Sequence, residues 1–163
     1  MKKVIIILLA ASFLAGCGYT TRSALSPALK TINIAAFENQ TYKYQIESIL
    51  ANKIANEFII DGRLQVVNAV EADTQLTGTI LEYCREPLVY DNNEEVTQYK
   101  IQVFADVTLK DLADGAIIWE GSRISGEDIY FVTGNLANTE EQARLEAFQD
   151  LARNIVDQVI EGW

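Results

Sequence analysis

Within residues 99–112, YKIQVFADVTLKDL, apolar and polar side chains alternate from Tyr99 to Lys110. A period of two places the apolar set on one face of a β-strand and the polar set on the other. Phe104 is the one apolar residue on the polar side. One buried and one wet face are typical of an antiparallel sheet. The apolar side of this strand therefore needs a covering layer, and its residues are Tyr99, Ile101, Val103, Ala105, Val107 and Leu109.

The C-terminal segment has the pattern of a helix that could provide this layer. Its apolar residues recur at helical spacing over about half of the helix surface, which suits a helix docked on a sheet. The helix is expected to begin near Thr139, and either Asn138 with Glu141 or Thr139 with Gln142 would form a capping box. The stripe consists of Ala147, Phe148, Leu151, Ala152, Ile155, Val156, Val159 and Ile160.

The N-terminal half combines strands with a second helix. KTINIAAF (30–37) alternates and predicts a strand, and residues 42–60 have a helical apolar spacing. Gly62 suits the left-handed end of that helix. RLQVVNAV (63–70) then predicts a second strand, and strand–helix–strand order favours a parallel pair. The apolar side of the helix consists of Ile46, Ile49, Leu50, Ile54 and Phe58.

The middle of the chain predicts further strands and a hairpin. Residues 72–84 read as a strand, and Asp114-Gly115 is a strong two-residue turn signal before the strand around Trp119. Residues 85–98 are expected to be a polar connection and residues 121–138 an irregular one.

These elements predict an α/β chain, more closely an α+β sandwich, in the order β-α-β-β-β-β-α. Two helices would pack on one face of a mixed four- to five-stranded sheet.

The first sixteen residues have the organisation of a secretory signal. Lys2 and Lys3 precede the apolar stretch 4–14, and Ala15-Gly16 follow it. In a helix this stretch reaches about 16 Å, too short for a hydrocarbon core of roughly 30 Å. We therefore expect residues 1–16 to be a signal peptide that is removed.

Leu14-Ala15-Gly16-Cys17 resembles the lipobox of bacterial lipoproteins. The resemblance implies that Cys17 becomes the first residue of the mature protein and carries covalent lipid such as palmitate. Several acyl chains give stable membrane anchoring. Gly18, in a position where such lipoproteins can carry an Asp that retains them in the inner membrane, favours the outer membrane. Residues 17–29 would form a tether, and residues 30–163 a single domain.

Charge and composition exclude several classes of function. The formal charge of −10 and the lack of a basic cluster argue against nucleic-acid binding. Removing residues 1–16 takes away two lysines and no acid, which leaves 11 basic and 23 acidic residues and a charge of −12. The chain has no histidine, which excludes Ser-His-Asp and Cys-His catalysis and imidazole metal sites.

No site for catalysis, a metal or a soluble cofactor emerges from the sequence. No nucleotide-binding loop is present, and the carboxylates are scattered through turns and outer helix faces. Cys84 is expected to be a partly buried strand residue without a base beside it. We therefore expect a chain that is not an enzyme, with no cofactor beyond the lipid on Cys17.

The mature chain resembles the LptE family of lipopolysaccharide-assembly lipoproteins. The motifs that carry the resemblance are CGYTT, INIAAFENQT, NEFIIDGR, the stretch from VEADTQLTG to VTQYKIQVFADVTLKD, IIWEG, DIYF and IVDQVIEGW. The family implies an outer-membrane lipoprotein that plugs and helps to assemble an LptD-type β-barrel. It also implies lipopolysaccharide as a second partner, and a position facing the periplasm or inside the barrel lumen.

Five residues are candidate contacts for lipid or barrel, namely Arg85, Tyr90, Lys100, Arg123 and Tyr130. Lipopolysaccharide is anionic and favours Arg and Lys. The neighbouring stretches DNNEEV and Glu127-Asp128 are acidic, however. Three alternatives follow: the lipid is not bound directly, it carries different phosphate groups, or metal ions bridge it to the protein.

A second function class stays open. INIAAFENQT followed by a helix also resembles the N-terminal domains of periplasmic secretion and Tol-type lipoproteins. This resemblance implies a scaffold, or a subunit of an oligomeric envelope complex.

Overall fold

The computed structural model describes residues 29–161. The predicted signal peptide, Cys17 and nearly all of the tether lie outside the described residues. The strands are β1 (Thr31–Ile34), β2 (Glu38–Asn39), β3 (Gln65–Val66), β4 (Thr74–Tyr90), β5 (Val96–Asp111) and β6 (Ile117–Phe131). The helices are α2 (Ile46–Asp61) and α3 (Glu140–Glu161). The α+β class and its element order are confirmed, with the two-residue β2 as an addition.

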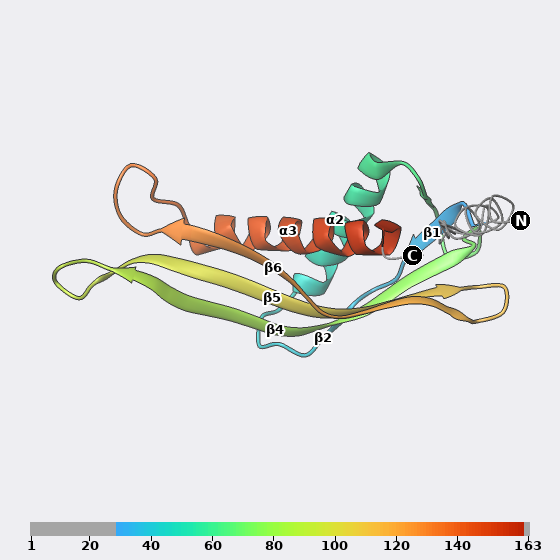
Figure 1. Ribbon diagram of the computed structural model, residues 1–163, viewed down its shortest axis with the longest axis horizontal. Coiled ribbons are helices and arrows are strands. Elements are labelled where there is room, and N and C mark those ends of the chain that lie inside the picture. Colours follow the sequence, from blue (N-terminus) through green and yellow to red (C-terminus); the bar gives the residue numbers. More distant parts are fainter. Residues whose placement is uncertain (1–28, 162–163) are drawn as a thin grey trace, which may run out of the picture.

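The chain forms one mixed sheet of six strands, in the order β3-β1-β4-β5-β6. β2 also pairs with β4, at Thr79 and Ile80, farther along the strand than the residues that pair with β1. β1 pairs in parallel with β3, as predicted, and also with β4. The long strands β4, β5 and β6 form an antiparallel meander that extends beyond the helices at both ends (Figure 1). The sheet is therefore long and narrow.

Both helices lie over the same face of the sheet (Figure 1). The predicted apolar positions of β5 from Ile101 to Leu109 are buried, and so is the whole predicted stripe of α3. α2 buries Ile46, Leu50, Ile54 and Phe58 in the same core. The other face has no helix of the described chain over it, so its polar side chains face solvent.

The strand boundaries differ from the prediction in two places. Residues 85–98 are not a polar connection: β4 continues to Tyr90, β5 begins at Val96, and only residues 91–95 form the turn. Pro87 is tolerated because this half of β4 is an edge strand, where a missing N–H costs no ladder bond. Likewise, residues 121–138 are not irregular throughout, because β6 runs on to Phe131 beside β5.

Three N-terminal elements are shorter than predicted. The strand expected over 30–37 is reduced to β1 (Thr31–Ile34). α2 begins at Ile46 because the Asn39 side chain holds the preceding segment in a turn. Its Oδ1 accepts the N–H of Thr41 at 2.9 Å, and its Nδ2 donates to the carbonyl of Lys43 at 2.6 Å. Gly62 ends α2 with a φ of 76°, as expected. The strand predicted over 63–70 pairs with β1 only at residues 65 and 66.

α3 covers the outer edge of β6 as well as the face of the sheet. Asp150 Oδ2 accepts the N–H of Glu127 at 3.1 Å, and Asn154 Nδ2 donates to the carbonyl of Ser125 at 2.8 Å. Between them, Gly126 lets the backbone of α3 approach, since a Cβ there would collide with Leu151. This contact fixes the helix along the strand.

The molecule has two different ends (Figure 1). The β4–β5 turn and the loop between β6 and α3 form the distal end. The β5–β6 turn, residues 69–73 and Leu29 form the proximal end, where the described chain begins. No helix among residues 29–161 has the length and apolar character needed to cross a membrane.

Candidate functional site

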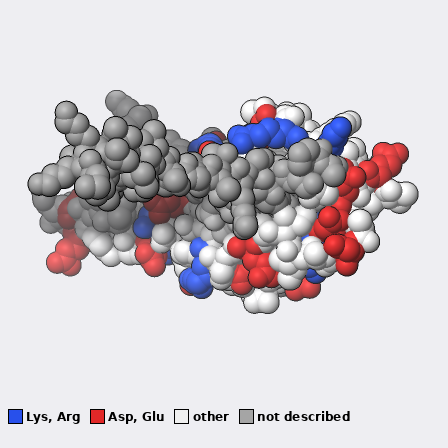
Figure 2. Space-filling view, turned by 45° about the vertical axis from the view of Figure 1, so that its right-hand side comes forward, with Lys and Arg blue, Asp and Glu red and all other residues white. Residues whose placement is uncertain are grey.

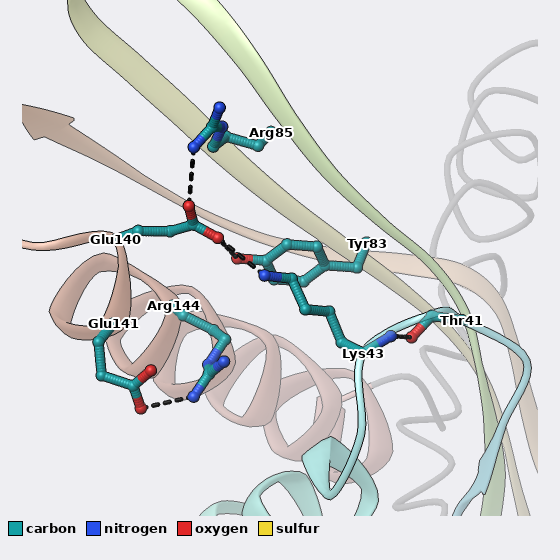
Figure 3. Close-up of polar contacts among 7 residues, drawn as sticks. All are labelled: Thr41, Lys43, Tyr83, Arg85, Glu140, Glu141 and Arg144. Atoms are coloured by element: carbon teal, nitrogen blue, oxygen red, sulfur yellow. Dashed lines mark hydrogen bonds and ion pairs between the residues drawn. The ribbon is translucent and has the colours of Figure 1, made fainter.

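The largest group of interacting charged side chains lies at the N-terminus of α3 (Figure 3). We call it the Glu140 cluster, comprising Lys43, Tyr83, Arg85, Glu140 and Arg144 with its partner Glu141. It joins the segment before α2, the strand β4 and the first turn of α3, which are far apart in the sequence.

Local capping places Glu140 at the start of the helix. Thr139 Oγ1 accepts the N–H of Gln142 at 3.2 Å, and Gln142 Oε1 accepts the N–H of Thr139 at 3.0 Å. Of the two capping boxes considered, the pair Thr139–Gln142 is formed. Asn138 instead accepts the N–H of Phe131. A carboxylate in the first turn is favoured by the helix dipole.

Glu140 bridges two cations from different elements. Its Oε1 lies 2.9 Å from Lys43 Nζ, and its Oε2 lies 2.8 Å from Arg85 Nη1. These interactions, with Lys43 the larger, hold the pKa of Glu140 below its ordinary value despite partial burial. Arg144 turns to Glu141 instead, at 2.5 Å. Three cations thus face two carboxylates.

Aromatic rings line the cluster. Lys43 Nζ lies 5.0 Å from the ring centroid of Tyr83, and the guanidinium of Arg85 lies 4.6 Å from that of Tyr99. Such cation–π contacts orient the charged groups as well as stabilise them. Burial and the neighbouring Glu140 raise the pKa of Tyr83, so its hydroxyl stays protonated and donates to Glu140 Oε1 at 3.4 Å.

The five predicted contact residues lie in three separate places. Arg85 is in the Glu140 cluster, and Tyr130 is close to it through Tyr99, whose ring stacks on that of Tyr130 at 5.5 Å. Tyr130 is only 4% exposed and contributes mainly to the core. Tyr90 ends β4 at the distal end and is 56% exposed.

Lys100 and Arg123 lie on the opposite, open face of the sheet, and each is paired with an acid. Lys100 Nζ is 3.5 Å from Glu127 Oε2, and Arg123 Nη2 is 3.1 Å from Glu82 Oε2. The guanidinium of Arg123 also covers the ring of Phe104 at 4.7 Å, which explains the one apolar residue on the polar side of β5. Neither cation is therefore available without breaking an internal pair.

Arg123 also marks a bulge in β6. Its φ of 49° is left-handed, and Asp106 Oδ1 accepts its N–H at 2.7 Å and the Ser122 hydroxyl at 3.1 Å. The register between β5 and β6 shifts at this point. Bulges of this kind re-aim a side chain, and here Arg123 lies over Phe104 and reaches Glu82.

Cys84 donates to Glu82 Oε1 at 3.1 Å on the same face. Partial burial and this carboxylate raise the pKa of the thiol to about 11. A protonated thiol is a poor nucleophile. Within residues 29–161, no group of three or more Cys, Asp or Glu side chains is arranged to hold a metal ion.

The described part of the face shown in Figure 2 carries both basic and acidic side chains, and the acidic ones cover more of it. The sequence-based candidates do not form one basic patch, because Arg85 lies in the Glu140 cluster while Lys100 and Arg123 lie on the open face, each paired with an acid.

Sequence reasoning missed Lys43, Tyr83 and Glu140. The capping box placed Glu140 in the first turn of a helix, but no local signal connects it with Lys43, 97 residues away.

The comparisons with known proteins decide the family. The sequence model described as "LptE: Lipopolysaccharide-assembly" matches residues 29–160. The chain belongs to the LptE family. Membership places this LptE-family chain among lipopolysaccharide-assembly lipoproteins, and the earlier resemblance is confirmed. No curated protein sequence matches it.

Solved structures with the same fold have little sequence in common with this LptE-family chain. A hypothetical protein, CT253, from Chlamydia trachomatis is 11% identical, with 81% of this chain and 96% of that chain covered and a TM-score of 0.55. A minor lipoprotein from Acinetobacter baumannii is 17% identical, with coverage of 82% and 92% and a TM-score of 0.51. The PelC dodecamer from Paraburkholderia phytofirmans is 14% identical, with coverage of 77% and 87% and a TM-score of 0.50. These likenesses concern the fold alone.

Proposed function

We propose that this protein is an outer-membrane lipoprotein that plugs and helps to assemble an LptD-type β-barrel for lipopolysaccharide transport to the cell surface. In this proposal Cys17 carries the lipid anchor, and the domain lies at the periplasmic side of the membrane or within the barrel lumen. The protein acts by contact and not as an enzyme. Membership of the LptE family is the observation that carries the proposal.

The open face of the sheet supports the plug role. Two of its cations are paired with acids of the chain, in Lys100–Glu127 and Arg123–Glu82. A polar surface with satisfied groups remains stable in a water-filled lumen and does not require a basic or acidic partner. The long, narrow meander gives this surface the elongated shape that a barrel interior can accommodate.

The distal end supplies a surface for the barrel wall. Leu88, Val89 and Tyr90 at the end of β4 are exposed, and so are Val132 and Leu136 in the loop before α3. Exposed apolar groups gathered at one end of a soluble domain are typical of an interaction site. We propose that Tyr90 contacts the barrel there.

For lipopolysaccharide, the Glu140 cluster offers the most suitable cations. Arg85 and Lys43 converge on one carboxylate and are separated by about the width of that group. A lipid phosphate has the same charge sign and accepts the same hydrogen bonds as a carboxylate. We propose that such a phosphate competes with Glu140 for these two side chains.

The first test is affinity purification from detergent-solubilised outer membranes. A one-to-one complex with a large β-barrel is expected. A self-associated ring without a barrel would contradict the plug role and support the scaffold or envelope-complex alternative. Depletion of the protein should also lower the amount of surface lipopolysaccharide.

Photo-crosslinking tests the contact surface. A crosslinking amino acid at Tyr90 should yield a barrel adduct in cells. The same group at Tyr44, which is 91% exposed and lies just before α2, is the matched control and should yield little. Equal adducts at both positions would argue against a specific distal contact.

Lipidation needs its own test. Cys17→Ser should abolish incorporation of labelled palmitate, whereas Cys84→Ser should leave it unchanged. Palmitate labelling that persists in the Cys17→Ser variant would contradict the proposed lipid anchor at Cys17.

A further inference from the structure

The proximal end of the domain carries apolar side chains that the core does not use. Val70 is 98% exposed, Leu112 is 42% exposed and Ile117 is 55% exposed. They come from the β3–β4 connection and the β5–β6 hairpin, which the bond from Leu112 N–H to the Asp73 carbonyl at 2.9 Å holds together. Beside them is an open hollow of about 630 Å³, lined by Leu29, Ala69, Val70, Ala72, Leu112 and Ala113 among others.

The path of the chain fixes where this end lies relative to the proposed anchor. Asp73 Oδ2 accepts the N–H groups of Lys30 and Thr31 at 2.9 and 3.0 Å, so the first described residues are fastened to the proximal end. Leu29 lies 12 positions after Cys17 in the sequence. A flexible chain of that length has an end-to-end distance of about 20 Å, and of at most about 43 Å when extended. The β4–β5 turn is much farther away, because the 17 residues of β4 alone extend over about 55 Å.

The charges at this end suit the headgroup layer of a membrane. Lys30 and Lys110 are exposed and make no ion pair with another described residue, unlike Arg85, Lys100 and Arg123. Their long side chains can reach lipid phosphates while the apolar groups lie among the headgroups. The nearby acids are partly engaged by backbone N–H groups: Asp111 accepts that of Ala113, and Asp114 that of Ala116.

We propose that the proximal end is a membrane-contact surface that rests on the phospholipid leaflet holding the Cys17 lipid. Val70, Leu112 and Ile117 enter the headgroup region, and Lys30 and Lys110 flank them. Because Glu71, Asp73, Asp111 and Asp114 outnumber the two lysines, the surface selects zwitterionic over anionic phospholipid. The contact fixes the orientation of the domain, with the proximal end at the leaflet surface and Tyr90 at the end remote from these phospholipids, where the barrel contact proposed above lies. This inference rests on the lipid anchor proposed above.

The experiment uses the full lipidated protein in a Cys84→Ser background, so that an introduced cysteine is the only thiol available for labelling. Val70→Cys is labelled with the fluorophore NBD, and the protein is reconstituted into phosphatidylcholine–phosphatidylethanolamine vesicles containing a lipid with a nitroxide near its headgroup. Leu136→Cys at the distal end and Tyr44→Cys near α2 are the matched controls, because both side chains are highly exposed. Quenching by the nitroxide lipid should be several-fold stronger at position 70 than at either control.

The outcomes separate the two proposals. Flotation of the protein with the vesicles reports the anchor, whatever the fluorescence shows. Flotation with equal quenching at all three positions, or with none at position 70, overturns the orientation alone. Blue-shifted emission at position 70 without quenching also overturns it, because the hollow is then covered by protein, such as residues 17–28. Replacing part of the lipid by phosphatidylglycerol should weaken quenching at position 70, and stronger quenching would contradict the proposed lipid preference.

Discussion

Gly126 of β6 lies against the backbone of α3 at Leu151, closely enough that no side chain fits between the strand and the helix. Asp150 and Asn154 bond to the strand on either side of this contact. The three residues together set the distance and the position of α3 along β6. The buried stripe of the helix, from Ala143 to Ile160, depends on that placement.

Gly126→Ala should lower the free energy of unfolding by about 1–3 kcal/mol, because the added methyl group forces α3 away from the sheet. Urea unfolding followed by circular dichroism measures the change. Ser125→Ala is the control, since its side chain is exposed and only its carbonyl is used. Equal unfolding midpoints for Gly126→Ala and wild type would show that the contact can relax without cost.

Glu140→Gln should lower the free energy of unfolding at neutral pH by about 1 kcal/mol, since it removes two partly exposed ion pairs, with Lys43 and Arg85. Asp157→Asn on the same helix is the control, because its carboxylate makes no ion pair with a described residue. If Asp157→Asn lowers the free energy of unfolding as much as Glu140→Gln does, the effect comes from removing any negative charge on α3 and not from the two ion pairs of Glu140.

The Glu140 contribution should also depend on pH. Its folded-state pKa is below the ordinary value of 4.5, so the carboxylate stabilises the fold fully above that value. The contribution disappears as the pH falls through the lowered pKa. The stability difference between wild type and Glu140→Gln should therefore shrink as the pH falls below the ordinary value of 4.5. A difference that stays constant over this range would mean that the carboxylate has an ordinary pKa in both states.

Glu140→Gln should bind purified lipopolysaccharide several-fold more tightly than wild type, because Arg85 and Lys43 lose their internal partner. Fluorescence anisotropy of labelled lipopolysaccharide measures the binding. Glu127→Gln is the matched control, as it releases Lys100 on the open face instead. If Glu127→Gln strengthens binding and Glu140→Gln does not, the lipid contacts the open face.

Cys84 should react slowly with thiol reagents in the folded protein. A pKa of about 11 leaves on the order of 100-fold less thiolate at pH 8 than an ordinary thiol has. Glu82→Gln removes the carboxylate that accepts the hydrogen bond of the thiol and disfavours the thiolate, so it should increase the alkylation rate. The rate in denaturant provides the reference for an unperturbed thiol, and a folded-state rate equal to it would contradict the raised pKa.

The parts of the fold that sequence predicted well are those with a periodic pattern. The alternation around Val103 and the stripe around Leu151 each identify one buried face, because burial acts on every second or every third to fourth residue. Both patterns were confirmed. The hairpin at Asp114-Gly115 was also confirmed, but its loop spans residues 112–116 and not two residues. Gly115 in this loop has a left-handed φ of 75°, which favours glycine.

The parts that were predicted wrongly depend on contacts between distant segments. The second half of β4 is largely exposed and contains Pro87, yet it is a strand because β5 offers it a partner along its length. Gln45 adopts a left-handed φ of 63° before α2, which no local signal indicates. The Glu140 cluster likewise exists only once α3 has docked. The local sequence identified Arg85 as a candidate but could not show that Glu140, 55 residues away, is its ion-pair partner.

The parallel pairing of β1 with β3 and β4 has a mechanical consequence. Force applied through residue 29 acts along the axis of β1, which is hydrogen-bonded on both sides. The ladders would be loaded in shear, so that their bonds resist together and do not open one after another. The backbone bonds from Lys30 and Thr31 to Asp73 share the same load. A tether attached at this point can be pulled without peeling the domain apart.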